Sequence, residues 1–205
     1  MTNRRTPDGA PSTVGLWLDP VCPFSWNTAR WLTAAADKAG FDIEWRLMSL
    51  AILNEGRELP PPQRARMEDS RQVGRLMAAL HDELGAGLMG RAYIAFAQQY
   101  FDHSAEVDGE LVDHVTRAVG AEHTGAAALV DAALDATVLK FHQRSQNALG
   151  DTGGSPVLTI EGHTVFGPVF TAVPKPDETL AVFDAVTALV RTPEVSQLQR
   201  PRSHT

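Results

Sequence analysis

The chain has only one cysteine among its 205 residues, Cys22, so no disulfide can form within it. Such scarcity of cysteine is typical of proteins in reducing compartments, and it predicts a cytoplasmic location. No apolar run approaches the roughly 20 residues of a membrane-spanning helix, so we expect no membrane partner. The N-terminal sequence MTNRRTPDGAPST has two arginines but no apolar segment after them, which does not fit a secretory signal.

Basic residues are also scarce, since 18 Lys and Arg face 25 Asp and Glu and the formal net charge is −7. A nucleic-acid-binding domain usually needs a basic face, so we predict no nucleic-acid partner. The seven histidines form no H-E-x-x-H motif, and a second cysteine for a zinc site is absent. We therefore expect no metal. The hydrophobic fraction of 43% is enough to build a core, and it excludes a wholly disordered chain.

The first fifty residues have a strand–helix–strand pattern. The apolar run 14–18 ends at Asp19-Pro20 and predicts a buried strand. A helical pattern then continues to Gly40, a residue type that commonly ends helices. Residues 41–50 partly alternate between apolar and polar, which predicts a second strand. A right-handed βαβ crossover is the expected topology.

The middle of the chain has a different pattern, because the break Pro60-Pro61-Pro62 is followed by a long segment rich in Ala, Leu, Gln and Arg. This segment predicts five helices, the last three over 111–119, 125–134 and 138–149. Strand patterns return at 156–160 and 164–166, and a helix is expected over 177–190. The fold class is therefore α/β. We expect residues 13–59 and 150–192 to form two parts of one domain and residues 60–149 to form an inserted helical domain, with tails at 1–12 and 193–205.

Cys22 is the first candidate for chemistry, because it lies where the first strand gives way to the first helix. Pro23 suits the first helical turn, which places Cys22 at the helix N-terminus. Free amides and the helix dipole favour an anion there, and they can lower a thiol pKa from about 8.5 towards roughly 3.5–7.5. The alternative is a cysteine that packs as a small buried hydrophobic side chain.

Ser155-Pro156 is the second candidate, at the start of the strand after the helical segment. It is either an ordinary proline opening an edge strand or a cis peptide bond, which is a rare and specific feature. A cis bond would turn the backbone N–H and C=O of Ser155 outward, where they could pair with an extended thiol substrate.

These motifs resemble the DsbA-like branch of the thioredoxin superfamily. The resemblance rests on the segments Cys22-Pro23-Phe24-Ser25-Trp26, Ser155-Pro156-Val157, Phe166-Gly167-Pro168-Val169 and 48–55. Within that branch the sequence is most similar to the mycothiol-dependent reductases, also called nitroreductases. The resemblance implies a thioredoxin-like fold with an inserted helical domain, a cis-proline loop beside the cysteine, and often a homodimer. It also implies mycothiol as the low-molecular-weight thiol, with glutathione as the other candidate.

The sequence departs from the C-x-x-C motif of that family at Ser25. Without a resolving cysteine, Cys22 cannot close an intramolecular disulfide, so a dithiol mechanism is excluded. A monothiol route needs only one thiolate and an external thiol. Ser25 could then donate a hydrogen bond to the Cys22 thiolate and stabilise its charge. The alternative is that Ser25 was introduced by engineering in order to trap a mixed disulfide on Cys22.

Two alternative functions follow from the same residues. The motif also resembles the Ser-Pro-Tyr-Ser-Trp region of kappa-class glutathione transferases and 2-hydroxychromene-2-carboxylate isomerases, which use a hydroxyl to hold a bound thiolate. Cys22 in place of the first serine weakens that resemblance. The other alternative is a redox-inactive module that binds a thiol.

The leading hypothesis is a monothiol oxidoreductase that reduces disulfides, mixed disulfides or small electrophilic substrates. Cys22 and Ser25 are its expected catalytic residues. The expected thiol- and substrate-binding residues are Pro23, Phe24, Trp26, Ser155 and Pro156. We expect Phe24 to be exposed and Trp26, in the first helical turn, to line a ligand cleft.

Overall fold

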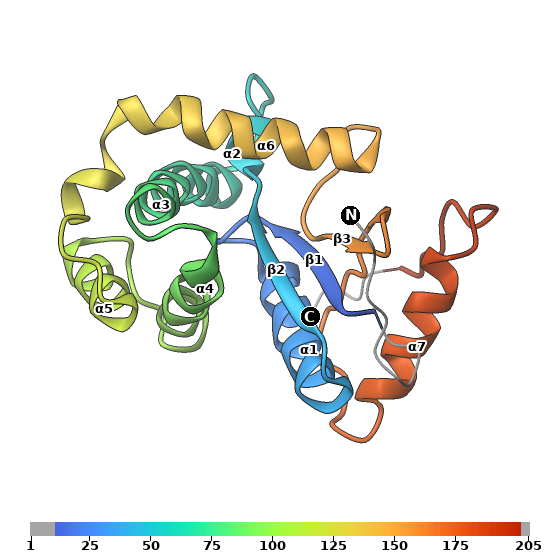
Figure 1. The fold of residues 1–205 in the computed structure, drawn as a ribbon. Coiled ribbons are helices and arrows are strands. Elements are labelled where there is room, and N and C mark those ends of the chain that lie inside the picture. Colours follow the sequence, from blue (N-terminus) through green and yellow to red (C-terminus); the bar gives the residue numbers. More distant parts are fainter. Residues whose placement is uncertain (1–10, 202–205) are drawn as a thin grey trace.

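The computed structural model describes residues 11–201, and the predicted tails fall partly outside that range, at 1–10 and 202–205. Four strands form one sheet in the order β2-β1-β3-β4 (Figure 1). Their bounds are β1 Thr13–Leu18, β2 Asp42–Leu47, β3 Val157–Ile160 and β4 His163–Phe166. The helices are α1 Pro23–Ala39, α2 Leu50–Leu53, α3 Pro61–Leu84, α4 Met89–Ala97, α5 Gly109–Val119, α6 Asp135–Leu149 and α7 Thr179–Val190.

The sheet is mixed, and the predicted βαβ unit forms one half of it, with β2 at the edge and β1 inside. Strand β1 pairs with β2 in parallel and with β3 antiparallel, so that Leu16 lies opposite both Trp45 and Leu158. Helix α1 makes the crossover, and Gly40 ends it in the left-handed conformation that glycine adopts without strain. The second strand is shorter than the predicted 41–50, because the Ser49 hydroxyl accepts the Ile52 N–H and thereby caps α2.

The segment between β2 and β3 is helical, as its composition predicts, and α3, α4 and α5 lie together at one end of the sheet (Figure 1). One predicted helix, 125–134, is wrong. Two short 3₁₀ turns, Ala126–Leu129 and Ala132–Leu134, replace it. The physical reason is Asp131, whose extended backbone (ψ 99°) interrupts the helix while its carboxylate caps the Ala133 N–H.

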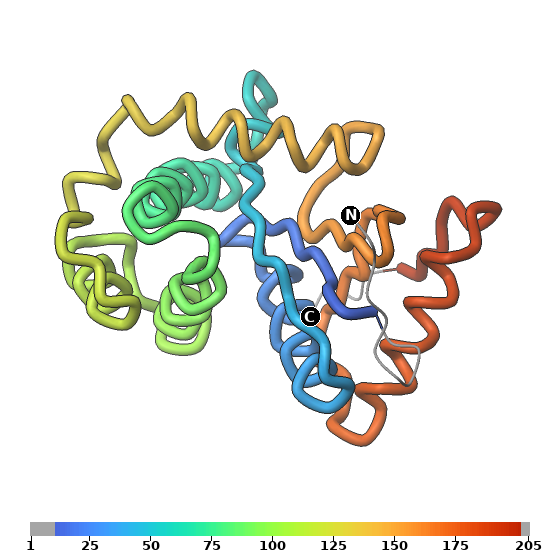
Figure 2. Tube along the Cα trace, viewed as in Figure 1, coloured from blue at the N-terminus to red at the C-terminus, as the bar shows by residue number. Residues whose placement is uncertain are grey.

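Two contacts join this helical segment to the sheet. A Cβ on Gly90 would lie 2.5 Å from the Trp45 indole nitrogen, so only glycine lets α4 approach β2 this closely. Helix α6 also contacts β2 and β4, and it leads back to β3 across the end of the sheet (Figure 2). Among residues 11–201, no helix is both long and apolar enough to cross a membrane.

Candidate active site around Cys22

Cys22 ends the short turn that connects β1 to α1. The Asp19 carbonyl accepts the Cys22 N–H at 3.2 Å, and one Asp19 carboxylate oxygen accepts the Val21 N–H at 2.9 Å. Helix α1 then begins at Pro23, and the Cys22 carbonyl accepts the first helical N–H, from Trp26, at 3.1 Å. Cys22 is thus the N-cap residue of α1, although its side chain makes no capping hydrogen bond.

The loop before β3 lies against this turn. The Ser155–Pro156 peptide bond is cis, and the Cys22 Sγ donates to the Ser155 carbonyl at 3.4 Å. Behind it, the Gly167 N–H donates to the Pro156 carbonyl at 2.8 Å, so the segment after β4 supports the proline loop. The fold therefore brings together two segments that are 133 positions apart in the sequence.

A line of hydroxyl groups joins the same two segments. The Asp19 N–H donates to the Ser155 Oγ at 2.8 Å, and the Ser155 and Ser25 Oγ atoms are 2.6 Å apart. When Ser155 donates its hydroxyl proton to Ser25, the Ser25 proton is left to point at the Cys22 sulfur. The side chain of Ser155, and not only its backbone, thus belongs to the site.

The carboxylate of Asp19 is fully buried and accepts hydrogen bonds from three elements. Its second oxygen accepts the Leu50 N–H at 2.6 Å and the Ser70 hydroxyl at 2.5 Å, and the Ser70 oxygen in turn accepts the Ala51 N–H. Burial raises the pKa of Asp19, while the Ser70 hydroxyl and the Leu50 and Val21 amides oppose that rise. Asp19 thereby fixes the Cys22 turn to α2 and α3.

The expectation that the helix N-terminus lowers the Cys22 pKa is wrong. The side chain is only 3% exposed, and burial raises the pKa of the thiol because it removes water from the anion. The Ser25 hydroxyl and the Ser25 and Phe24 amides lower that pKa, whereas the charge of Asp19 raises it. Desolvation outweighs these donors, so the resting thiol is neutral and donates a hydrogen bond to the Ser155 carbonyl.

Two of the aromatic expectations also need correction. Phe24 is half-buried rather than exposed, as is Pro23 beside it. Trp26 is buried, with its ring stacked on Phe101 and its indole N–H donated to an Asp102 carboxylate oxygen at 3.2 Å. Trp26 therefore packs α1 against the helical segment and exposes almost no surface to a ligand.

Two surface recesses lie near this site, and Cys22 lines neither of them. One is formed by Leu18, Pro20, Trp45, Arg46, Leu47, Met77, Met89 and Tyr93. The other lies between α2 and the start of α3 and is lined by residues that include Asn54, Arg57, Arg64 and Arg71. Within residues 11–201, no group of three or more His, Cys, Asp or Glu side chains is placed to hold a metal ion.

Sequence reasoning missed three parts of the site, which are Asp19, Ser70 and the side chain of Ser155. Asp19 carries a signal, since a carboxylate directly after a buried strand is placed in the interior with donors around it. Ser70 carries none, because a serine in a long amphipathic helix does not identify a partner 51 positions away.

Solved structures with the same architecture show the fold. The chain is similar to the cytosolic disulfide reductase DsbM from Pseudomonas aeruginosa, solved with GSH. The two are 16% identical with a TM-score of 0.54, over 86% of this chain and 99% of that one. It is also similar to a 2-hydroxychromene-2-carboxylate isomerase, at 15% identity and a TM-score of 0.56 over 87% of this chain and 96% of that one. The predicted DsbA-like thioredoxin fold is confirmed.

Sequence comparison identifies the family. The chain is 30% identical over 198 residues to the uncharacterized protein Rv2286c of Mycobacterium tuberculosis (strain ATCC 25618 / H37Rv). This match covers 94% of this chain and 83% of the relative. The model of the Rv2466c-like family, described as the mycothiol-dependent nitroreductase Rv2466c, matches residues 21–200. This chain therefore belongs to the Rv2466c-like family of mycothiol-dependent nitroreductases.

Proposed function

We propose that this protein is a thiol-dependent oxidoreductase in which Cys22 is the only nucleophile and mycothiol supplies the electrons. Family membership supports the oxidoreductase class and the thiol. The observation that carries the proposal is the contact of the Cys22 sulfur with the Ser155 carbonyl, beside the paired hydroxyls of Ser25 and Ser155. A thiol, two hydroxyls and a cis-proline loop meet at one helix N-terminus.

The chemistry is thiol–disulfide exchange in two displacements. The Cys22 thiolate attacks one sulfur of a disulfide substrate, so a Cys22–sulfur bond forms, the substrate bond breaks, and the leaving thiolate takes up a proton. A thiolate from solution then attacks the sulfur attached to Cys22 and releases the Cys22 thiolate. One external thiol thus replaces one half of the substrate disulfide, and the other half leaves as a free thiol. When the substrate is a mixed disulfide of mycothiol and Cys22 attacks the mycothiol sulfur, the products are the free substrate thiol and mycothiol disulfide, and the protein ends unchanged.

The serine at position 25 adapts the site to this route. A hydroxyl cannot attack the mixed disulfide as a resolving cysteine would, so the mixed disulfide must wait for an external thiol. The Ser25 hydroxyl instead lowers the pKa of Cys22 as a hydrogen-bond donor, as do the amides of Phe24 and Ser25.

Ionisation must reorganise the sulfur. The neutral thiol donates to the Ser155 carbonyl, but a thiolate has no proton to give and is repelled by that oxygen. The charged sulfur therefore turns towards the Ser25 hydroxyl and the first amides of α1. This movement frees the Ser155 carbonyl to accept a hydrogen bond from the bound thiol, while half-buried Pro23 and Phe24 contact its non-thiol part.

Substitution of the two catalytic candidates tests the proposal. With mycothiol as reductant and a mixed disulfide as substrate, we expect Cys22→Ser to lose at least about a hundredfold in turnover, since a serine hydroxyl is a far weaker nucleophile. Ser25→Ala should keep measurable turnover with a higher thiol pKa. Unchanged turnover of a folded Cys22→Ser protein would exclude the proposal.

A second candidate function is that of an isomerase or transferase that only holds a thiol cofactor. The observation in its favour is the Ser25–Ser155 hydroxyl pair beside a cysteine that is almost completely buried. In that case Cys22 is dispensable and no mixed disulfide forms on it. The cytoplasmic location and the division into two domains remain predictions from the sequence, and the homodimer remains what the family resemblance implies.

A further inference from the structure

Tyr93 is a buried polar residue that the proposed exchange reaction leaves unused. It belongs to α4 and is only 2% exposed. Among residues 11–201, no group accepts or donates a hydrogen bond at its hydroxyl. A buried hydroxyl without a partner destabilises a fold, and phenylalanine would fill the same space without that cost. The stability of the fold therefore does not explain why this position has a tyrosine.

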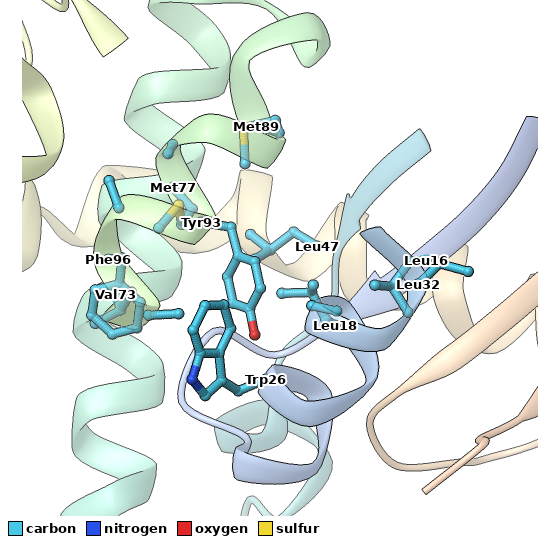
Figure 3. Close-up of a cluster of buried hydrophobic side chains, with 14 of the residues drawn as sticks. Leu16, Leu18, Trp26, Leu32, Leu47, Val73, Met77, Met89, Tyr93 and Phe96 are labelled. Atoms are coloured by element: carbon cyan, nitrogen blue, oxygen red, sulfur yellow. The ribbon is translucent and has the colours of Figure 1, made fainter. Parts of the chain in front are cut away.

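The hydroxyl points towards the turn that carries Cys22. Figure 3 shows the Tyr93 oxygen directed between Leu18 and Trp26, and the chain between those two residues contains Cys22. The Tyr93 ring lies edge-on against the Trp26 ring, with centroids 6.1 Å apart, and it also packs on Trp45, with centroids 5.8 Å apart. These contacts hold the phenol in one orientation.

The charges around the phenol identify its neighbours independently. Burial raises the pKa of Tyr93, and the next largest cause is the negative charge of Cys22, followed by that of Asp19. Arg30 on α1 acts in the opposite direction. These are the three titratable or charged groups that act on Tyr93 among the described residues. The phenol thus stays protonated, and among the charged groups it is the nucleophile that raises its pKa most.

We propose that Tyr93 donates a hydrogen bond to the Cys22 sulfur in its thiolate form, as a donor that the helical segment supplies to the site. The inference rests on the proposed role of Cys22 as nucleophile. In the resting state the thiol is turned to the Ser155 carbonyl, and the phenol has no partner. On ionisation the sulfur leaves that carbonyl, and Tyr93 becomes a second hydroxyl donor in addition to Ser25. The same bond stabilises Cys22 when it leaves the mixed disulfide.

The two tyrosines of the chain make a matched test. Tyr93→Phe removes the proposed donor. Tyr100→Phe removes a hydroxyl that donates to the Asp69 carboxylate at 2.6 Å and is not among the groups that shift the pKa of Cys22. Because Cys22 is the only cysteine, the rate of alkylation by iodoacetamide as a function of pH gives its pKa directly. Thermal unfolding of each variant reports on the fold.

For Tyr93→Phe we expect a higher thiol pKa and an alkylation rate about tenfold lower at neutral pH, which corresponds to about one pKa unit. Its unfolding temperature should be unchanged or higher, because an unpartnered group is removed. For Tyr100→Phe we expect an unchanged thiol pKa and a lower unfolding temperature.

An unchanged thiol pKa in Tyr93→Phe would overturn the inference, and so would an equal shift in Tyr100→Phe. Neither result would touch the proposed function, which depends on Cys22→Ser losing turnover. Conversely, a fully active Cys22→Ser protein would end the proposed function, whatever the alkylation rates show.

Discussion

Two buried regions contact helix α1, and they differ in the kind of side chain that fills them. Where α1 meets α7, the interior is aromatic. Trp31 lies against Phe170 with centroids 5.0 Å apart, and Phe41 stacks on Phe183 at 4.7 Å. Around Cys22, at the N-terminus of the same helix, the interior is polar and contains Asp19, Ser25 and Ser155.

The difference separates stability from chemistry. Aromatic contacts gain free energy from area removed from water and from ring geometry. The polar region gains little net free energy. Each of its groups loses hydrogen bonds to water on burial, and a hydrogen bond within the protein does little more than offset that loss. A fold selected only for stability would fill this space with apolar side chains. We therefore infer that the polar region is maintained for what it does to the sulfur.

The largest expected effect on stability comes from the aromatic side. Phe183→Ala removes a buried ring and should lower the free energy of unfolding by about 3–5 kcal/mol. Leu180→Ala on the same helix, at a position 38% exposed, is the control and should cost far less. Chemical denaturation measures both. A cost for Phe183→Ala no greater than that of the control would contradict the assignment of stability to this region.

A smaller loss is expected at the polar side from Asp19→Asn. The amide NH₂ would face the Leu50 N–H or the Val21 N–H, and a donor left without an acceptor costs about 1–3 kcal/mol. The charge that raises the Cys22 pKa is also removed, so the thiol pKa should fall. Denaturation and alkylation against pH give the two values, and exposed Asp184→Asn serves as control. A rise in the thiol pKa would contradict the account.

Ser155→Ala should have a still smaller effect on stability, about 1 kcal/mol, because it removes the acceptor of one backbone N–H, that of Asp19. The thiol pKa should rise, since Ser25 loses the partner that orients its proton. Alkylation rates test this, with Ser25→Ala as the comparison. If Ser155→Ala leaves the thiol pKa unchanged while Ser25→Ala raises it, Ser155 has no part in orienting the donor.

The smallest effect concerns alkaline pH. The Cys22 pKa is raised above its ordinary value in the folded protein, so above that ordinary value the folded state holds a proton that the unfolded chain has lost. Stability must therefore fall as the pH rises from the ordinary thiol pKa towards the folded pKa. The unfolding temperature of Cys22→Ala should decline less over that range. Parallel declines in both proteins would show that Cys22 is not the group responsible.

The parts of the fold that depend on local pattern could be predicted from the sequence. The apolar run of β1, the glycine that ends α1 and the break at the three prolines identify their elements directly. The prediction of one helix over 125–134 was wrong. The apolar spacing of this segment fits a helix, but it gives no sign that Asp131 caps a new turn and so interrupts the helix.

The position of the candidate site could be predicted from the sequence, but the direction of the Cys22 pKa shift could not. The pattern at Cys22 and Pro23 identifies a helix N-terminus, where isolated amides would lower a thiol pKa. Burial by side chains from elsewhere reverses that result, and the buried carboxylate of Asp19 adds to it. The burial of Cys22 cannot be read from neighbouring residues, because it arises from segments distant in the sequence. Asp19 is only three positions away, but its carboxylate is held in the interior by Leu50 and Ser70, which are distant.

The most direct test of the central claim is the intact mass of the protein during turnover. With mycothiol limiting and a mixed disulfide in excess, we predict a population that carries one thiol adduct on Cys22, which disappears when more mycothiol is added. The adduct should be absent from Cys22→Ser. Turnover that proceeds with no adduct at any ratio of thiol to substrate would contradict the claim that Cys22 is the nucleophile.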